Sequence, residues 1–281
     1  MSTILEEIAE YKRNVEIPAL LAEKSIHEIM QDSAAARPPL DFIHAIRNAS
    51  GIALIAEIKK ASPSRGLIRA DFHPVKLAEG YEKGGADAIS ILTDFKYFQG
   101  SLDHFQHVRA ACPNTPLLRK DFTVHPVQIY ESRSAGADAI LLIAAILSNQ
   151  EINQFQQIAH SLGMAALIEV HNLEELERVL SFNPKLIGIN NRDLHDFSVD
   201  VTNCLRLRAN VPSGITLIAE SGIHTPFDMA ALKGASIDAA LIGEAIVKTP
   251  VVEEKIKKLL AFVRPPASHI ITTQQREAAA V

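Results

Sequence analysis

The chain has 281 residues, of which 47% are hydrophobic, so it can form one large domain or two small ones. Its formal net charge is −5, with charges of both signs spread along the chain. The absence of a basic run and an aromatic content of only 5% argue against a nucleic-acid or anionic-membrane surface.

The two cysteines, Cys112 and Cys204, form neither a CxxC pair nor a disulfide framework, which fits a reducing compartment. The first residues, MSTILEEIAEYKRN, lack the apolar run of a secretory signal. No stretch approaches the ~20 apolar residues that a membrane span requires. We therefore expect a cytoplasmic protein.

Residues 1–48 open with apolar side chains at helical spacing: Ile4, Leu5, Ile8, Tyr11 and Val15. This pattern predicts an N-terminal helical extension whose apolar face packs on the rest of the chain. At the other end, Pro265 and Pro266 follow the last helical pattern. Residues 265–281 are polar and without periodicity, and we expect a disordered tail.

Between these ends, short apolar runs alternate with helical stretches. Such near-continuous apolar strands indicate a parallel sheet covered by helices, and eight strand–helix units predict an α/β fold, a (β/α)8 TIM barrel, over residues 49–264. The predicted strands are 52–58, 87–93, 115–120, 138–143, 164–169, 185–190, 215–220 and 238–242.

A weak internal repeat supports the barrel. The segments GGADAISIL (84–92), AGADAILLI (135–143) and GASIDAALI (234–242) each lead from the end of a helix, through a small residue and aspartate, into a buried strand. The alternative is that any α/β protein reuses such a turn.

Function in a TIM barrel lies at the carboxyl ends of the strands. Strand side chains alternate with period two, so Glu57 and Lys59 share a face, while Lys120 and Glu169 have the parity of the leucines two residues before them. With Glu220 after the seventh strand, two lysines and three carboxylates would converge on one mouth. The alternative is that these are solvated strand ends.

The loops after the last two strands suggest a phosphate site. Ser221-Gly222 and Gly243-Glu244 occupy the positions where many TIM barrels bind phosphate through backbone N–H groups. The SPSRG loop at 62–66 is either a lid or a simple polar loop, and Ser62 within it is a candidate substrate-binding residue.

Eight segments together resemble the indole-3-glycerol phosphate synthase family. The resemblance runs through the whole barrel in order, and related phosphate-binding barrels share pieces of it but not the set. The segments are IAEIKKASPSRG (55–66), ILTDFKYFQGS (91–101), LLRKDF (117–122), GADAILLI (136–143), LIEVHN (167–172), IGINNRDL (187–194), AESGI (219–223) and LIGEAI (241–246).

The resemblance implies a reaction that closes an indole ring. The substrate is 1-(2-carboxyphenylamino)-1-deoxyribulose 5-phosphate, whose aryl carbon attacks the ketose carbonyl before carbon dioxide and water leave. The resemblance implies that Lys120 is the general acid and that Glu169 is the base for dehydration. It also implies that Glu57 and Lys59 form a pair that orients groups and supports proton transfer. It implies no metal and no organic cofactor.

The resemblance also implies substrate contacts. Asn190 and Arg192 would position polar groups, and Glu220 would be a further carboxylate of open role. The implied phosphate cradle comprises Ser221, Gly222, Gly243 and Glu244, with help from Lys59. The implied apolar wall comprises Phe98, Phe122, Leu141 and Leu194.

A lysine is a useful general acid at neutral pH only if its pKa is lowered toward neutrality. We expect such a lowering for Lys120, because burial near the Lys59 cation would disfavour its charged form. Tyr11 is a candidate for the aromatic contact that the family often supplies from its N-terminal helix, and His171 either contacts substrate or fills the rim. The cluster Asp193, His195 and Asp196 lacks the further ligands that a metal site needs.

The alternatives to the synthase are another phosphosugar isomerase, a Schiff-base aldolase that uses Lys120, and a degenerate barrel that only binds a sugar phosphate. The expected partner is a small sugar phosphate, with no nucleic acid or membrane, and the expected state is a monomer or weak homo-oligomer.

Overall fold

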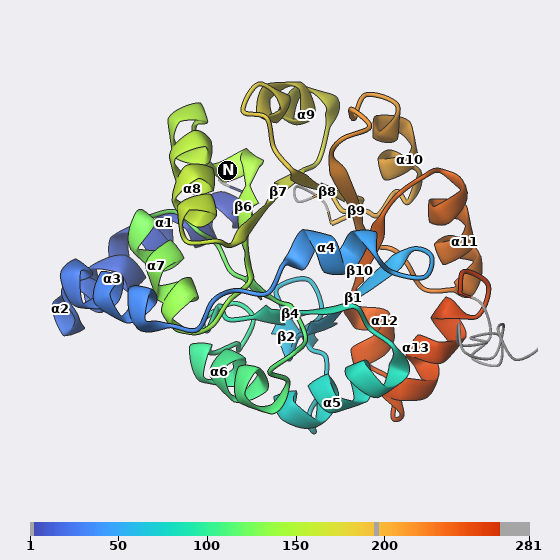
Figure 1. Cartoon of the computed structure of the whole chain (residues 1–281), viewed down its shortest axis with the longest axis horizontal. Helices are drawn as coiled ribbons and strands as arrows, with labels where there is room; N and C mark the ends of the chain where they lie inside the picture. Colours follow the sequence, from blue (N-terminus) through green and yellow to red (C-terminus); the bar gives the residue numbers. More distant parts are fainter. Residues whose placement is uncertain (1–2, 194–196, 265–281) are drawn as a thin grey trace, which may run out of the picture.

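A computed structural model of the chain describes residues 3–193 and 197–264, and its centre is a closed barrel of eight parallel strands (Figure 1). The strands are paired in the order β1-β10-β9-β8-β7-β6-β5-β4. All eight predicted strands are confirmed to within two residues. They are β1 (Ala53–Ile58), β4 (Ala88–Leu92), β5 (Leu117–Lys120), β6 (Ala139–Ile143), β7 (Ala165–Val170), β8 (Leu186–Asn190), β9 (Thr216–Glu220) and β10 (Ala239–Ile242).

Helices surround the barrel and alternate with its strands, as Figure 1 shows. The predicted TIM barrel is therefore confirmed. These helices are α5 (Pro74–Gly84), α6 (Leu102–Ala111), α7 (Pro126–Ser134), α8 (Asn149–Ser161), α9 (Leu173–Leu180), α10 (Thr202–Arg208), α11 (Pro226–Gly234), the short α12 (Glu244–Val247) and α13 (Val252–Leu260). Two short strands, β2 (Ala61–Ser62) and β3 (Gly66–Leu67), form a hairpin after β1, and a 3-10 turn, η2 (Ala144–Ile146), follows β6.

Strand alternation sorts the apolar side chains into two layers. Leu54 and Ala56 of β1 belong to the large cluster between sheet and helices, whereas Ile55 belongs to the cluster inside the barrel. Leu118, Leu167 and Ile218 also belong to the inner cluster. The residues two positions later on β5, β7 and β9 therefore face inward at the carboxyl end of the barrel.

The repeated aspartates have a common structural role at the opposite end. Asp87, Asp138 and Asp238 each accept a hydrogen bond from a backbone N–H near the start of a neighbouring strand, at 2.7–2.8 Å. Asp138 is also bound by Arg109 Nη2 at 2.8 Å and by the N–H of Leu40 at 2.7 Å. The repeat thus satisfies polar backbone groups that the closed barrel buries.

The N-terminal segment reaches both ends of the barrel. It comprises α1 (Ile4–Tyr11), a π-helical turn η1 (Lys12–Glu16), α2 (Ile17–Glu23), α3 (Ile26–Ala35) and α4 (Phe42–Arg47). Leu5 and Ile8 of α1 pack on the inner cluster, as do Phe42 and Ile46 of α4. In Figure 1, α4 crosses in front of the barrel.

Val15 departs from the apolar stripe expected from helical spacing, since it is 46% exposed. The π-helical turn at residues 12–16 has a wider spacing than an α-helix and rotates Val15 away from the barrel. Leu194, His195, Asp196 and the predicted tail 265–281 lie outside the described residues. Among the described helices, none combines the length and apolar character that crossing a membrane requires.

Candidate active site

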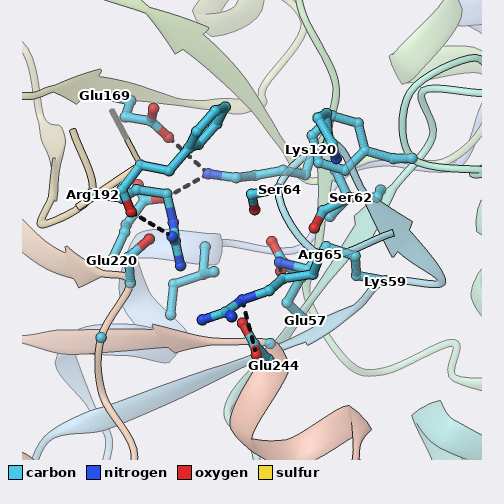
Figure 2. Close-up of a pocket in the computed structure, with 18 of the residues that line it drawn as sticks. Glu57, Lys59, Ser62, Ser64, Arg65, Lys120, Glu169, Arg192, Glu220 and Glu244 are labelled. Atoms are coloured by element: carbon cyan, nitrogen blue, oxygen red, sulfur yellow. Dashed lines mark hydrogen bonds and ion pairs between the residues drawn. The ribbon is translucent and has the colours of Figure 1, made fainter. Parts of the chain in front are cut away.

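A cavity of about 470 Å³ opens at the carboxyl ends of the strands. Figure 2 shows charged side chains from several strands and loops pointing into it. The structure brings these predicted site residues together on its lining: Glu57, Lys59, Ser62, Phe98, Lys120, Phe122, Leu141, Glu169, Arg192, Glu220, Ser221, Gly222, Gly243 and Glu244. Asn190 lies at the boundary instead, lining an adjoining hollow.

The ionisable residues at these strand ends are not solvated edges. Glu57, Glu169 and Glu220 are each less than 5% exposed. Lys120 Nζ lies between Glu169 Oε2 at 2.9 Å and Glu220 Oε2 at 2.5 Å (Figure 2). The site therefore contains a buried ammonium group held by two carboxylates from different strands.

The expected lowering of the Lys120 pKa is wrong. Burial alone would lower it, but Glu169, Glu220 and Glu57 outweigh that effect and raise the pKa of Lys120 above its ordinary value. Lys59 does not act as the neighbouring cation, because its Nζ pairs with Glu57 Oε2 at 2.6 Å. Lys120 is thus kept as an ammonium ion in this structure.

The two carboxylates that hold Lys120 differ from each other. Burial raises the pKa of Glu220 to about 7, and the nearby Glu169 charge adds to this effect while Lys120 opposes it. Burial also acts on Glu169, but Lys120 and His171 outweigh it and hold the pKa of Glu169 well below its ordinary value. Asn190 Nδ2 donates to Glu169 Oε1 at 3.2 Å. Glu169 is consequently the carboxylate best maintained as an anion.

The loops after β9 and β10 approach the strand ends closely. Ser221 and Gly222 both have left-handed backbone conformations, with φ of 66° and 79°. A Cβ placed on Gly243 would overlap the Glu57 carboxylate, so a larger residue there would have to displace that buried carboxylate. The carboxylate of Glu244 pairs with Lys248 Nζ at 2.6 Å. Glu244 Oε1 also lies 3.5 Å from Nε of Arg65, a side chain that lines the cavity, so cationic groups lie beside the Glu244 carboxylate at this edge (Figure 2).

An apolar wall lies across from these loops. The rings of Phe98 and Phe122 have centroids 5.8 Å apart. The structure adds apolar residues from α1 and from the loops that the sequence analysis did not place in a site: Ile4, Leu5, Ile8, Phe197, Val199 and Val201. Ser64 and Arg65, from the 62–66 loop that the sequence left as either a lid or a polar loop, also line the cavity. The helical spacing of the α1 residues indicated packing but not that they line a cavity.

Tyr11 is not part of this wall. Its ring packs edge-on against Tyr97 at 6.0 Å, and Lys96 Nζ lies 3.8 Å from its centroid. Apolar residues of α1, Ile4, Leu5 and Ile8, lie along the cavity instead.

A buried ion cluster beside the site also escaped the sequence analysis. Lys12 Nζ contacts Glu16 at 2.6 Å, Asp121 at 2.8 Å and Asp94 at 3.0 Å. Asp94 lies two residues after the end of β4, and Asp121 directly follows β5. Arg119 Nη2 lies 3.3 Å from Asp121. The cluster therefore connects the N-terminal segment to the carboxyl end of the barrel through buried ion pairs.

The chain is similar along most of its length to known proteins of one family. Residues 5–259 match the family model described as indole-3-glycerol phosphate synthase. An indole-3-glycerol phosphate synthase of Microcystis aeruginosa is 48% identical over 263 residues, covering 91% of this chain and 88% of that protein. The corresponding protein of Roseiflexus sp. is 45% identical over 266 residues, covering 92% and 98%. The chain belongs to the indole-3-glycerol phosphate synthase family.

The family defines the activity of the protein as that of a carboxy-lyase of tryptophan biosynthesis acting on a small phosphate substrate. Solved structures of lower identity show only the shared fold. A 3-hexulose-6-phosphate synthase aligns with a TM-score of 0.60 at 15% identity, covering 75% of this chain and all of that one. A thiamine phosphate pyrophosphorylase from Pyrococcus furiosus aligns with a TM-score of 0.57 at 14% identity, covering 75% and 95%.

Proposed function

We propose that this cavity carries out the indole-3-glycerol phosphate synthase reaction with Lys120 as the general acid. The observation that supports this role is the Lys120 ammonium, held by Glu169 and Glu220 at the inward end of β5. As the aryl carbon attacks the ketose carbonyl, negative charge develops on the carbonyl oxygen. A fixed ammonium stabilises that charge more than it stabilises the neutral ketone.

Proton transfer then follows from relative basicity. An alkoxide is a stronger base than an amine, so Lys120 gives up a proton to it even with a raised pKa. Loss of carbon dioxide restores the aromatic ring. In the dehydration step Lys120, which solvent has reprotonated, gives a proton to the hydroxyl so that it leaves as water, and Glu169 accepts the proton released from the ring carbon beside nitrogen. Its lowered pKa keeps it available as a base at neutral pH.

The remaining residues bind and orient the substrate. Phe98, Phe122 and Leu141 enclose the anthranilate ring, with Leu194 proposed for the same wall. The backbone of Ser221-Gly222 and Gly243-Glu244 receives the phosphate, assisted by Lys59 and Ser62. Asn190 and Arg192 position polar groups, and Glu57 holds Lys59. Anchoring both ends of the substrate brings the reacting carbons together.

The raised pKa of Lys120 argues against the aldolase alternative, because Schiff-base formation requires a neutral amine. We further propose that the enzyme acts in the cytoplasm, as a monomer or weak homo-oligomer, without metal, organic cofactor or nucleic-acid partner.

The test is indole fluorescence after mixing the protein with 1-(2-carboxyphenylamino)-1-deoxyribulose 5-phosphate. The chain contains no Trp, so the product would appear against a low background. A signal that requires no added metal and disappears in Lys120→Ala supports the proposal. If Lys120→Ala turns over at the wild-type rate, another residue is the acid. Borohydride trapping of substrate on Lys120 would instead support the aldolase.

A further inference from the structure

His171 lies directly behind the proposed base. It follows Glu169 by two residues, so both side chains leave β7 and its end on the same side. His171 Nε2 is 3.3 Å from Glu169 Oε1, and its Nδ1 is 3.2 Å from Glu175 Oε2. The imidazole therefore lies between two carboxylates, one in the site and one outside it.

Glu175 is held in place independently of the imidazole. It belongs to the first turn of α9, and its carboxylate accepts hydrogen bonds from the His171 N–H at 2.8 Å and from Asn172 Nδ2 at 2.9 Å. Only the contact of Nδ1 with Glu175 has hydrogen-bond geometry, because Nε2 has no hydrogen-bond partner among the described residues and its contact with Glu169 is an ion-pair distance. A carboxylate on each side of the ring nevertheless stabilises a positive charge on it. The surroundings therefore favour the imidazolium ion.

The electrostatics of the group agree with this geometry. Burial alone would lower the pKa of His171, but Glu169 and Glu175 raise it to about 10. A hollow of about 530 Å³ adjoins the ring on its outer side. The charged residues that line this hollow with His171 and Glu175 are Glu6 from α1, Arg192 and Asp193 after β8, and Asp200 and Arg206 at α10.

We propose that His171, held by Glu175, is a positioning residue that keeps Glu169 ionised and correctly aimed during turnover. The proposal rests on the role of Glu169 as the base. Lys120 is one cation beside Glu169, but it becomes a neutral amine when it protonates the substrate. His171 then remains as the cation on the other carboxylate oxygen, and Asn190 supplies the neutral hydrogen bond.

The first test compares the pH dependence of kcat in two variants. His171→Gln keeps a hydrogen-bond donor but removes the charge, whereas His171→Lys keeps a charge. Loss of a cation beside the Glu169 carboxylate raises the pKa of Glu169, so the acidic limb of the kcat–pH profile should move up by about one pH unit in His171→Gln. In His171→Lys most of that shift should be reversed. His160→Gln on α8, a half-buried histidine that does not line the cavity, should leave the profile unchanged.

A merely structural role predicts a different result. It would lower kcat by a constant factor at all pH values, with the acidic limb in its wild-type place, and that outcome would overturn the proposal. Failure of the proposed base itself is distinguishable, because Glu169→Gln would then retain wild-type turnover.

A second measurement decides the charge of His171 without relying on catalysis. In the wild-type protein, carbon-13 resonances of labelled histidine can be followed with pH, and His171→Gln assigns the signal. The midpoint should lie well above the ordinary histidine value of about 6.5, and Glu175→Gln should lower it. A wild-type midpoint at or below that ordinary value would refute an imidazolium behind the base.

Discussion

Replacing Lys12 by methionine tests whether the N-terminal segment is fixed by the buried ion cluster. The side chain is 2% exposed, and its ammonium contacts three carboxylates within 3.0 Å. Methionine fills similar space without the charge and leaves Asp94, which is fully buried, without its cation. Breaking a buried pair in this way costs about 3–5 kcal/mol.

For a domain of this size, each kcal/mol lowers Tm by about 2–4 °C, so the expected loss is roughly 6–20 °C. Calorimetry at pH 7 would measure it. The matched control is Lys24→Met, which removes an exposed ion pair with Asp32 and should cost no more than about 1 kcal/mol. A loss in Lys12→Met as small as in the control would refute the anchoring role.

The pH dependence provides a second check. Burial raises the pKa of Asp121, but Lys12 and Arg119 outweigh it and hold that pKa below its ordinary value. A carboxyl with a depressed folded-state pKa adds stability above its unfolded pKa, about 3.9, and loses that contribution as the pH falls. The loss of unfolding free energy in Lys12→Met, relative to the wild type, should therefore be full at neutral pH and become smaller below about pH 4. A loss that instead becomes larger as the pH falls would contradict the lowered pKa of Asp121.

Catalysis should respond as well. Asp94 Oδ1 accepts hydrogen bonds from the N–H groups of Tyr97 at 2.7 Å and Phe98 at 3.2 Å. Freeing Asp94 from Lys12 should loosen the Phe98 wall, so Lys12→Met should raise KM by a larger factor than it lowers kcat. Steady-state indole fluorescence separates the two constants, and an unchanged KM would indicate that the wall does not depend on the cluster.

Three further variants test other parts of the structure. Lys120→Met removes the proposed acid and should lower kcat by about 10²- to 10⁴-fold, with wild-type kcat as the contradicting result in the fluorescence assay. Gly243→Ala places a methyl group against the Glu57 carboxylate and should lower kcat/KM at least about tenfold, since small misplacements in a site are costly. Gly234→Ala, where a Cβ meets nothing within 4 Å, is its control, and equal activity of the two would contradict the crowding argument. Asp138→Asn weakens a buried carboxylate bound by arginine and backbone N–H groups, and should cost about 3 kcal/mol by urea unfolding, whereas an unchanged midpoint would show that the charge is dispensable.

The sequence by itself determined the barrel and the inward direction of its strand ends. Period-two alternation and the spacing of strand–helix units are local properties, so they can be read without knowing which strands are neighbours. Lys120, Glu169 and Glu220 were accordingly placed at one mouth before their distances were known. The repeated aspartates Asp87, Asp138 and Asp238 were visible in the sequence, but their structural role was not, because the backbone N–H groups that they bind belong to other strands.

Only the tertiary structure decided how the charges act on one another. Lys120 meets Glu169 and Glu220 across 49 and 100 residues of sequence, and Lys59 turns to Glu57. A pKa depends on distances of a few ångströms, which parity along a strand does not supply, and so the expected direction for Lys120 was wrong. The Lys12 cluster escaped for the same reason: a lysine on a helical segment is ordinarily solvated, and folding alone brings Asp94 and Asp121 against it.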